Sequence, residues 1–401
     1  MKTHGIHHIS MISRHGQEVI DFYSGLLGLK LVKKTLNFDN PNQYHITFGT
    51  NEAELGSLLT FFPHPKAKPG IQGDGQVRTI TLAVPENSFK FWQNRLTKFE
   101  VSYSIIRKFN QNYLTFKDLD GIEIELLETN EGKPNIFEFN GVTKEVAVKG
   151  IYNVVLNASN PKTEDFLKAI GYQFEQESSL YKRYKLETSD VLGRYIEIYK
   201  PGEDQGNNSI GTVHHLALTV LEKEIEAWDK KIRDLGLLPS EIKDRKYFRS
   251  MYFKEFSNIL IELATEKPGM TEDESVSELG TNFLIPPHFK NLPKETFDHL
   301  MPLEVKEVTK LTKYDYIDME SYKSSHRHRD ILNEINLLAR KAKTEGLTEA
   351  ELERRAILRK EYVASVTGGV RNMVEKVKLV DEDGNEEEGF IKKGKGVETW
   401  N

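Results

Sequence analysis

The chain has 401 residues, of which 38% are hydrophobic and 29% are charged, and its 55 basic and 61 acidic side chains give a net charge of −6. This balance predicts a soluble protein of roughly two to three domains and argues against nucleic-acid binding by the main domain. The sequence has no cysteine, which excludes disulfide bridges, thiolate nucleophiles and iron–sulfur clusters, so any metal must bind histidine and carboxylate. Since no apolar run approaches about 18 residues and the N-terminus lacks a signal pattern, we expect no membrane span and a cytoplasmic location.

Four segments open in the same way, with a small or polar residue followed by an alternating apolar strand: 5–13, 76–84, 150–158 and 212–220. A stretch with helical periodicity follows each of them: 16–27, 88–98, 162–169 and 221–235. A second recurring strand then closes each unit: 56–62, 121–127, 193–199 and 258–264. The interval between helix and closing strand has room for two more strands, so the sequence predicts four βαβββ modules.

The segment after the modules changes character twice. Residues 269–325 contain several prolines and predict an extension that packs on the modules and then becomes a linker. Residues 326–380 predict an αα-hairpin, with a break at Gly346, a capping box at 348–351 and an end at Gly368-Gly369. The tail at 381–401 consists of acidic and basic runs and is predicted to be disordered.

We therefore expect an α+β fold of four modules followed by a helical hairpin. Modules 1 and 2 make a first domain at 4–140, and modules 3 and 4 make a second at 148–268. Extension, hairpin and tail complete the chain with the boundaries given above.

Equivalent positions of the modules carry metal-binding side chains. The fourth position of the opening strands holds His8, Thr79, Asn153 and His215. The fifth position of the closing strands holds Thr60, Glu125, Glu197 and Glu262. Because side chains alternate along a strand, each of these positions faces one side of its sheet, so two paired modules would share one cavity.

The modules can pair in three ways, and two of them divide the histidines between two cavities. Only the pairing of 1 with 4 and of 2 with 3 brings His8, His215 and Glu262 together, and we expect this arrangement. Two imidazoles and one carboxylate form the facial triad of non-haem metal oxygenases, which leaves positions open for substrate and O2. Such ligands suit Fe2+ or Mn2+.

Further residues are candidates for supporting roles. On regular strands His7 and His214 point away from the cavity, although a bulge could turn either one inward. Tyr252 precedes Glu262 by ten residues on the neighbouring strand and could lean over the metal, and Arg245 could orient an anionic oxygen. The alternatives are a core tyrosine and a surface arginine.

The remaining candidates are given structural roles. Glu125 and Glu197 are expected to be exposed or salt-bridged carboxylates. Eight histidines without an equivalent in another module are assigned solvated or local structural roles: His4, His15, His45, His64, His288, His299, His326 and His328.

Several motifs of the modules resemble the vicinal oxygen chelate superfamily, and more narrowly its ring-cleaving extradiol-type dioxygenases that act on hydroquinones. The likeness covers about residues 4–300 and is carried by Gly5-Ile-His-His-Ile-Ser10, Asp21-Phe-Tyr23, 28–35, 42–48 and Thr212-Val-His-His-Leu-Ala217. The resemblance implies the same three metal ligands and supporting roles for His7, His214, Tyr252 and Arg245. It also implies that the substrates are an aromatic diol and O2.

The hairpin resembles a small bacterial helical-hairpin family of unknown function, through 332–343, 346–349, 358–362 and 377–381. It suggests a protein partner for this segment, and homo-oligomerisation stays open. Two alternatives to the dioxygenase hypothesis are a glyoxalase- or thiol-transferase-like metalloenzyme and a non-catalytic protein that binds a quinone or a drug. Spacing does not distinguish hydroquinone from catechol as the substrate.

Overall fold

The structure is a computed structural model that describes residues 1–187 and 192–374. The predicted tail at 381–401 and the motif at 377–381 lie outside these residues. The chain forms two compact units, of which the first is Met1–Met319 and the second begins at Glu320. Within the described residues no helix is long and apolar enough to cross a membrane.

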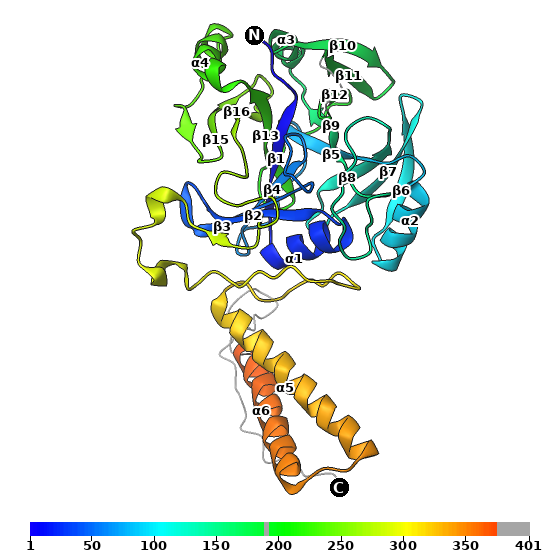
Figure 1. Cartoon of the computed structure of the whole chain (residues 1–401), viewed down its shortest axis with the longest axis vertical. Helices are drawn as coiled ribbons and strands as arrows, with labels where there is room; N and C mark the ends of the chain where they lie inside the picture. The colour runs from blue at the N-terminus through cyan, green and yellow to red at the C-terminus, as the bar shows by residue number, and fades with distance from the viewer. Residues whose placement is uncertain (188–191, 375–401) are drawn as a thin grey trace, which may run out of the picture. The chain divides into compact units, whose positions relative to one another are not determined.

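The first unit contains the four predicted βαβββ modules (Figure 1). Module 1 consists of β1 (Ile6–Ser13), α1 (Gly16–Ile20) with a π-helical continuation η1 (Asp21–Leu26), β2 (Lys30–Asn37), β3 (Asn40–Gly49) and β4 (Leu58–Pro63). Module 2 consists of β5 (Gln76–Val84), α2 (Phe89–Lys98), β6 (Tyr103–Lys108), β7 (Gln111–Lys117) and β8 (Glu123–Glu128). Module 3 consists of β9 (Gly150–Asn157), α3 (Lys162–Ala169), β10 (Tyr172–Glu177), β11 (Tyr181–Leu186) and β12 (Tyr195–Tyr199). Module 4 consists of β13 (Thr212–Val220), η2 (Glu222–Glu224), α4 (Ile225–Asp234), β14 (Lys243–Asp244), β15 (Phe248–Lys254) and β16 (Leu260–Pro268).

Each closing strand begins two residues later than predicted, for a shared reason. The residue that opens the predicted segment has a positive φ in every module: Gly56, Gly121, Gly193 and Asn258. Glycine and asparagine tolerate this left-handed conformation, which belongs to a turn and cannot continue a strand. The recurring residue therefore lies before the closing strand and is not part of it.

The modules pair 1 with 4 and 2 with 3, as predicted. One sheet has the order β14-β15-β16-β13-β1-β4-β3-β2-β17, and the other has β10-β11-β12-β9-β5-β8-β7-β6. The modules meet where β1 runs antiparallel to β13 and where β5 runs antiparallel to β9. Both sheets curl, so that one face of each is concave and the other carries helices. Trp92 of α2 and Trp228 of α4 are fully buried at equivalent helix–sheet contacts.

The segment 269–318 packs on module 1 and contains β17 (Phe283–Leu284), η3 (Pro287–Phe289) and η4 (Lys294–Phe297). β17 extends the first sheet by pairing in parallel with β2, a strand that the proline-rich sequence did not predict. Further along, the Tyr314 hydroxyl donates to Asp21 Oδ2 (2.8 Å), and the rings of Tyr314 and Tyr316 pack on His15. His15 also accepts from Gln17 N and so caps α1, a local structural role as predicted.

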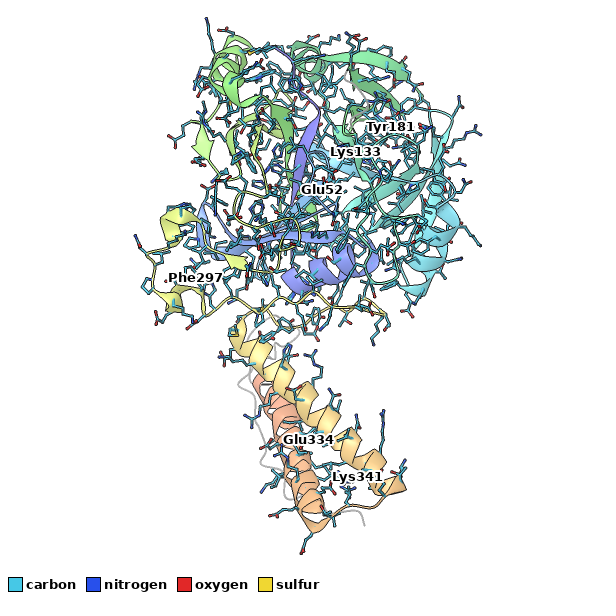
Figure 2. The ribbon with its side chains drawn as sticks, in the orientation of Figure 1. Glu52, Lys133, Tyr181, Phe297, Glu334 and Lys341 are labelled. Atoms are coloured by element: carbon cyan, nitrogen blue, oxygen red, sulfur yellow. The ribbon has the colours of Figure 1, made fainter. Side chains whose placement is uncertain are left out.

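The second unit is the predicted hairpin, formed by α5 (Met319–Thr344) and α6 (Glu349–Val374). Its core consists of Ile331, Leu338 and Leu358. Figure 2 labels Glu334 and Lys341 on α5; they pair across the hairpin with Arg354 (2.8 Å) and Glu351 (2.6 Å).

The hairpin's capping box is confirmed, since Thr348 N donates to Glu351 Oε2 (2.9 Å) and Glu351 N donates to Thr348 Oγ1 (3.3 Å). Gly368-Gly369 does not end α6 as predicted. Glycine inside a helix costs only about 1 kcal/mol, which the helical residues on both sides can offset.

Candidate functional site

Three side chains from three neighbouring strands converge on the concave face of the first sheet. His8 comes from β1, His215 from β13 and Glu262 from β16. The Nε2 atoms of the two histidines are 3.2 Å apart, and they lie 3.1 Å and 2.8 Å from Glu262 Oε2. All three side chains are buried, and one ligand atom of each lies within 4.8 Å of the others. The structure therefore brings together the three residues predicted as ligands.

A hydrogen bond with His7 determines which ring nitrogen of His8 carries the proton. His7 Nε2 lies 3.2 Å from the Thr265 carbonyl, and its Nδ1 lies 2.9 Å from His8 Nδ1. Burial and the neighbouring His8 lower the pKa of His7 to about 3, so the ring is neutral and carries one proton. A carbonyl can only accept, so that proton is on Nε2, and His7 Nδ1 accepts from His8 Nδ1–H. His8 Nε2 is then a bare lone pair that faces the other two ligand atoms, as metal binding requires.

His214 stands in the same relation to His215 but has a different environment. The two Nδ1 atoms are 2.8 Å apart, so His214 can hold the proton of His215 on Nδ1 in the same way. His214 is half-buried, lines the cavity and makes a ring contact with Phe62. His7 is fully buried, packs against Phe248 and does not itself line the cavity. Of the two flanking histidines, His214 is the one that reaches the cavity.

Glu262 is held in an orientation that suits a cation. The Tyr252 hydroxyl donates to Glu262 Oε1 (2.7 Å), while no N–H group in the described residues donates to the buried Oε2 in good geometry. Burial alone would raise the pKa of Glu262, but its close contacts with His8 and His215 hold it well below its usual range. A buried carboxylate oxygen without a donor would cost about 1–3 kcal/mol, which a metal ion at this point would remove. The donor set therefore fits a divalent cation.

Tyr252 and Arg245 lie at the site but are engaged with protein groups. Burial and Glu262 raise the pKa of Tyr252 above its usual value, so the phenol keeps its proton. Arg245 forms a two-point ion pair with Asp39 (3.1 and 2.7 Å) and lies 5.6 Å from the Tyr252 ring. Asp39 is in the turn between β2 and β3, so this pair links module 1 to module 4 at the cavity.

The three candidate ligands form one wall of a cavity of about 520 Å³, a size within the range of small-molecule sites. Phe38, Phe62 and Phe248 supply an aromatic lining. Lys33 also lines the cavity and is fully buried, with Nζ 2.6 Å from Asp273 and 2.7 Å from Glu274. Both acids belong to the segment after β16, which also contributes Met270 to the cavity wall.

His45 of β3 lines the cavity. The sequence predicted a solvated or local structural role for it, because no other module has a histidine at an equivalent position. Its ring stacks on Phe62 at 4.7 Å, and its Nε2 is buried without a hydrogen-bond partner in the described residues. Burial and the neighbouring imidazoles of His8 and His215 lower the pKa of His45 to about 3. Strand alternation could have found it, because His45 shares a face with two further cavity residues, Gln43 and Thr47.

The second sheet holds cationic side chains at the place that corresponds to the metal site. Glu125 and Glu197 are salt-bridged as predicted but fully buried. Lys108 Nζ lies 2.7 Å from Glu125 and 3.3 Å from Glu197, and Arg183 Nη2 lies 2.6 Å from Glu197. The ammonium and guanidinium groups neutralise both carboxylates and leave them unavailable to a metal.

Comparisons with known proteins agree with this architecture. Residues 5–126 match the family described as "Glyoxalase/Bleomycin resistance protein/Dioxygenase superfamily". The chain is 37% identical over 310 residues to the Bacillus subtilis protein named "Putative ring-cleaving dioxygenase MhqO", and the match covers 77% of this chain and 99% of that protein. It is 31% identical to the "Chlorohydroquinone/hydroquinone 1,2-dioxygenase" of Sphingobium indicum, over 73% of this chain and 95% of that protein.

A solved structure supports the same assignment. The crystal structure of a protein from Bacillus subtilis that is titled a putative dioxygenase superposes with a TM-score of 0.73 at 36% identity. The superposition covers 77% of this chain and 99% of that one.

The hairpin has relatives of its own. Residues 330–387 match a family described as "Bacterial protein of unknown function (DUF896)". A "UPF0291 protein" of Lactococcus lactis is 53% identical over 53 residues, which are 13% of this chain and 66% of that protein.

Proposed function

The chain belongs to the Glyoxalase/Bleomycin resistance protein/Dioxygenase superfamily and to its family of ring-cleaving dioxygenases, and from this premise we propose that it opens a hydroquinone-type ring with O2. The metal, Fe2+ or Mn2+, would be held by His8, His215 and Glu262. The observation that carries the proposal is the convergence of these three ligand atoms at the wall of an aromatic-lined cavity.

Bound metal would offer open positions to a substrate oxygen and to O2, and its charge would lower the pKa of a bound phenol. The side chains around it hold this centre in place. Tyr252 orients Glu262, and the Thr265 carbonyl orients His8 through His7. Such supporting contacts fix the direction of each ligand lone pair, and their loss commonly weakens metal affinity by 10–100-fold.

The other cavity residues supply an aromatic surface for the substrate ring and a hydrogen-bonding histidine beside it. Phe38, Phe62 and Phe248 present an apolar surface to an aromatic ring and exclude water from it. His214 lies in the cavity wall, and because its Nδ1 accepts from His215 its proton is on Nε2, for which no described residue provides an acceptor. This N–H can therefore donate to a substrate oxygen.

The residue at the fifth position of the first closing strand, Thr60, favours a metal centre with three protein ligands over a glyoxalase-like one with more carboxylates. Thr60 occupies the position in module 1 that Glu262 occupies in module 4, and its hydroxyl lies 2.5 Å from Ser10 Oγ. A short neutral side chain that is already paired does not supply a fourth protein ligand. More coordination positions are thus left to substrate and O2.

The test is oxygen uptake by protein loaded with Fe2+ under anaerobic conditions and then mixed with methylhydroquinone and O2. We expect one O2 consumed per ring opened. His215→Ala should lose at least 99% of this activity, and His64→Ala, a histidine at the exposed rim of the same cavity, should retain it. Metal-loaded protein that consumes no O2 with any diol would contradict the proposal.

A further inference from the structure

His45 is the one histidine of the cavity wall that neither joins the ligand set, nor supports a ligand, nor lies at the exposed rim among the described residues. It projects from β3, which is separated from β1 by β4 in the curled first sheet (Figure 1). The cavity therefore has the ligands on one part of its wall and His45 on another.

Neighbouring polar groups of this wall are already paired. The Gln43 amide donates to the Pro63 carbonyl (3.2 Å) and accepts from Asn37 (2.9 Å), and the Thr35 hydroxyl donates to the Leu36 carbonyl (3.1 Å). His45 Nε2, by contrast, is buried without a partner in the described part of the chain. Native structures leave few buried polar atoms in this condition, and a water, ion or ligand is among the explanations for those that exist.

The ring of His45 is fixed in its place. It stacks on Phe62 with an interplanar angle of 29°, and its strand position pairs with Thr35 of β2. The Nε2 atom of a neutral imidazole can accept a hydrogen bond from a phenolic hydroxyl or donate one to it, depending on which ring nitrogen carries the proton. Stacking on Phe62 also keeps the imidazole beside the surface on which an aromatic substrate would lie.

We propose that His45 binds the second hydroxyl of a para-diol whose first hydroxyl is at the metal. This inference rests on the proposed function and adds the residue that recognises the far end of the substrate. In a hydroquinone the two hydroxyls are at opposite ends of the ring, so a group on a wall away from the ligands can reach the second one. In a catechol both hydroxyls are adjacent and would lie at the metal, which leaves His45 without a partner.

The experiment compares hydroquinone with phenol, which lacks the second hydroxyl, as ligands of the anaerobic Fe2+-loaded protein. Dissociation constants are measured by titration for the parent, His45→Phe, His45→Gln and the rim control His64→Phe. We expect His45→Phe to weaken hydroquinone binding by about tenfold and to change phenol binding by less than about twofold. His45→Gln, which keeps a donor and an acceptor, should recover part of the loss, and His64→Phe should match the parent.

Two results would overturn the inference while leaving the dioxygenase proposal intact: an equal loss for both ligands in His45→Phe, or hydroquinone binding that His45→Phe does not change. Iron content measured on each variant shows whether the ligand set is preserved, and His45→Gln supplies the comparison if the phenylalanine variant does not fold. A parent protein that takes up no O2 with any diol would instead remove the proposed function, and the inference with it.

Discussion

Replacing Lys108 with methionine should destabilise the first unit by about 3–5 kcal/mol at pH 8, the range found when one partner of a buried ion pair is removed. Lys108 and the two carboxylates it contacts, Glu125 and Glu197, are all buried in the second sheet. Arg183 continues to neutralise Glu197 in the variant. Glu125 is then the carboxylate left without a cation, and it keeps only the hydrogen bond from Thr81 (2.7 Å).

The loss should depend on pH in a defined direction. Burial already raises the pKa of Glu125, and Lys108 is the main charge that opposes this rise. Without Lys108 the pKa rises further, so the folded protein holds a proton that the unfolded chain releases above about pH 4.3. The stability of the variant therefore falls by up to about 1.4 kcal/mol per pH unit between that value and the folded-state pKa. The loss is largest at high pH.

The assay is urea unfolding at pH 5 and pH 8, followed by the fluorescence of the buried Trp92 and Trp228. The double variant Lys108→Met/Glu125→Gln removes the orphan charge and should regain at least half of the loss at pH 8. Lys66→Met is the matched control, since Lys66 is exposed and its ion pair with Asp318 should contribute less than about 1 kcal/mol. A Lys108→Met protein as stable as the parent at pH 8, or one with equal losses at both pH values, would refute the reasoning.

Three further outcomes are expected. Tyr252→Phe removes the donor to Glu262 and should weaken Fe2+ affinity 10–100-fold in a chelator competition titration, and unchanged affinity would show that this contact does not matter. Burial raises the pKa of Asp118 to about 7, so between pH 4 and pH 7 the folded protein holds a proton on this carboxyl that the unfolded chain has released. The free energy of unfolding should therefore fall by up to roughly 4 kcal/mol from pH 4 to pH 7. Asp118→Asn should flatten this dependence in urea unfolding at several pH values. A chain ending at Met319 should keep full turnover. A chain ending at residue 300 loses the Tyr314 contact to Asp21 of η1 and should melt at a lower temperature, and the opposite order would contradict the packing described.

The candidate ligands could be predicted because they occupy positions that every module repeats. His8 and His215 stand at one place in the opening strands and Glu262 stands at one place in a closing strand, so comparing modules aligned them without knowledge of the fold. The chemistry of the ligands then selected one pairing of modules, which the sheet order confirms.

The middle strands offered no such register, because the loops around them differ in length between modules. His45 of β3, Lys108 of β6 and Arg183 of β11 all lie on such strands, and the environment of each is visible only in the folded structure. In the hairpin, short sequence motifs predicted where the second helix begins but not where it ends. The capping box at Thr348 marks where α6 begins. The helix continues through Gly368-Gly369, because the helical residues on both sides offset the small cost of the two glycines.

The central claim is that two imidazoles and one carboxylate hold a single metal ion. A crystal structure of Fe2+-loaded protein, with the iron located by anomalous scattering, tests it most directly. The account predicts one iron at about 2.0–2.2 Å from His8 Nε2, His215 Nε2 and a Glu262 oxygen. Iron bound at other residues, or fully loaded protein with no anomalous peak among these three side chains, would contradict it.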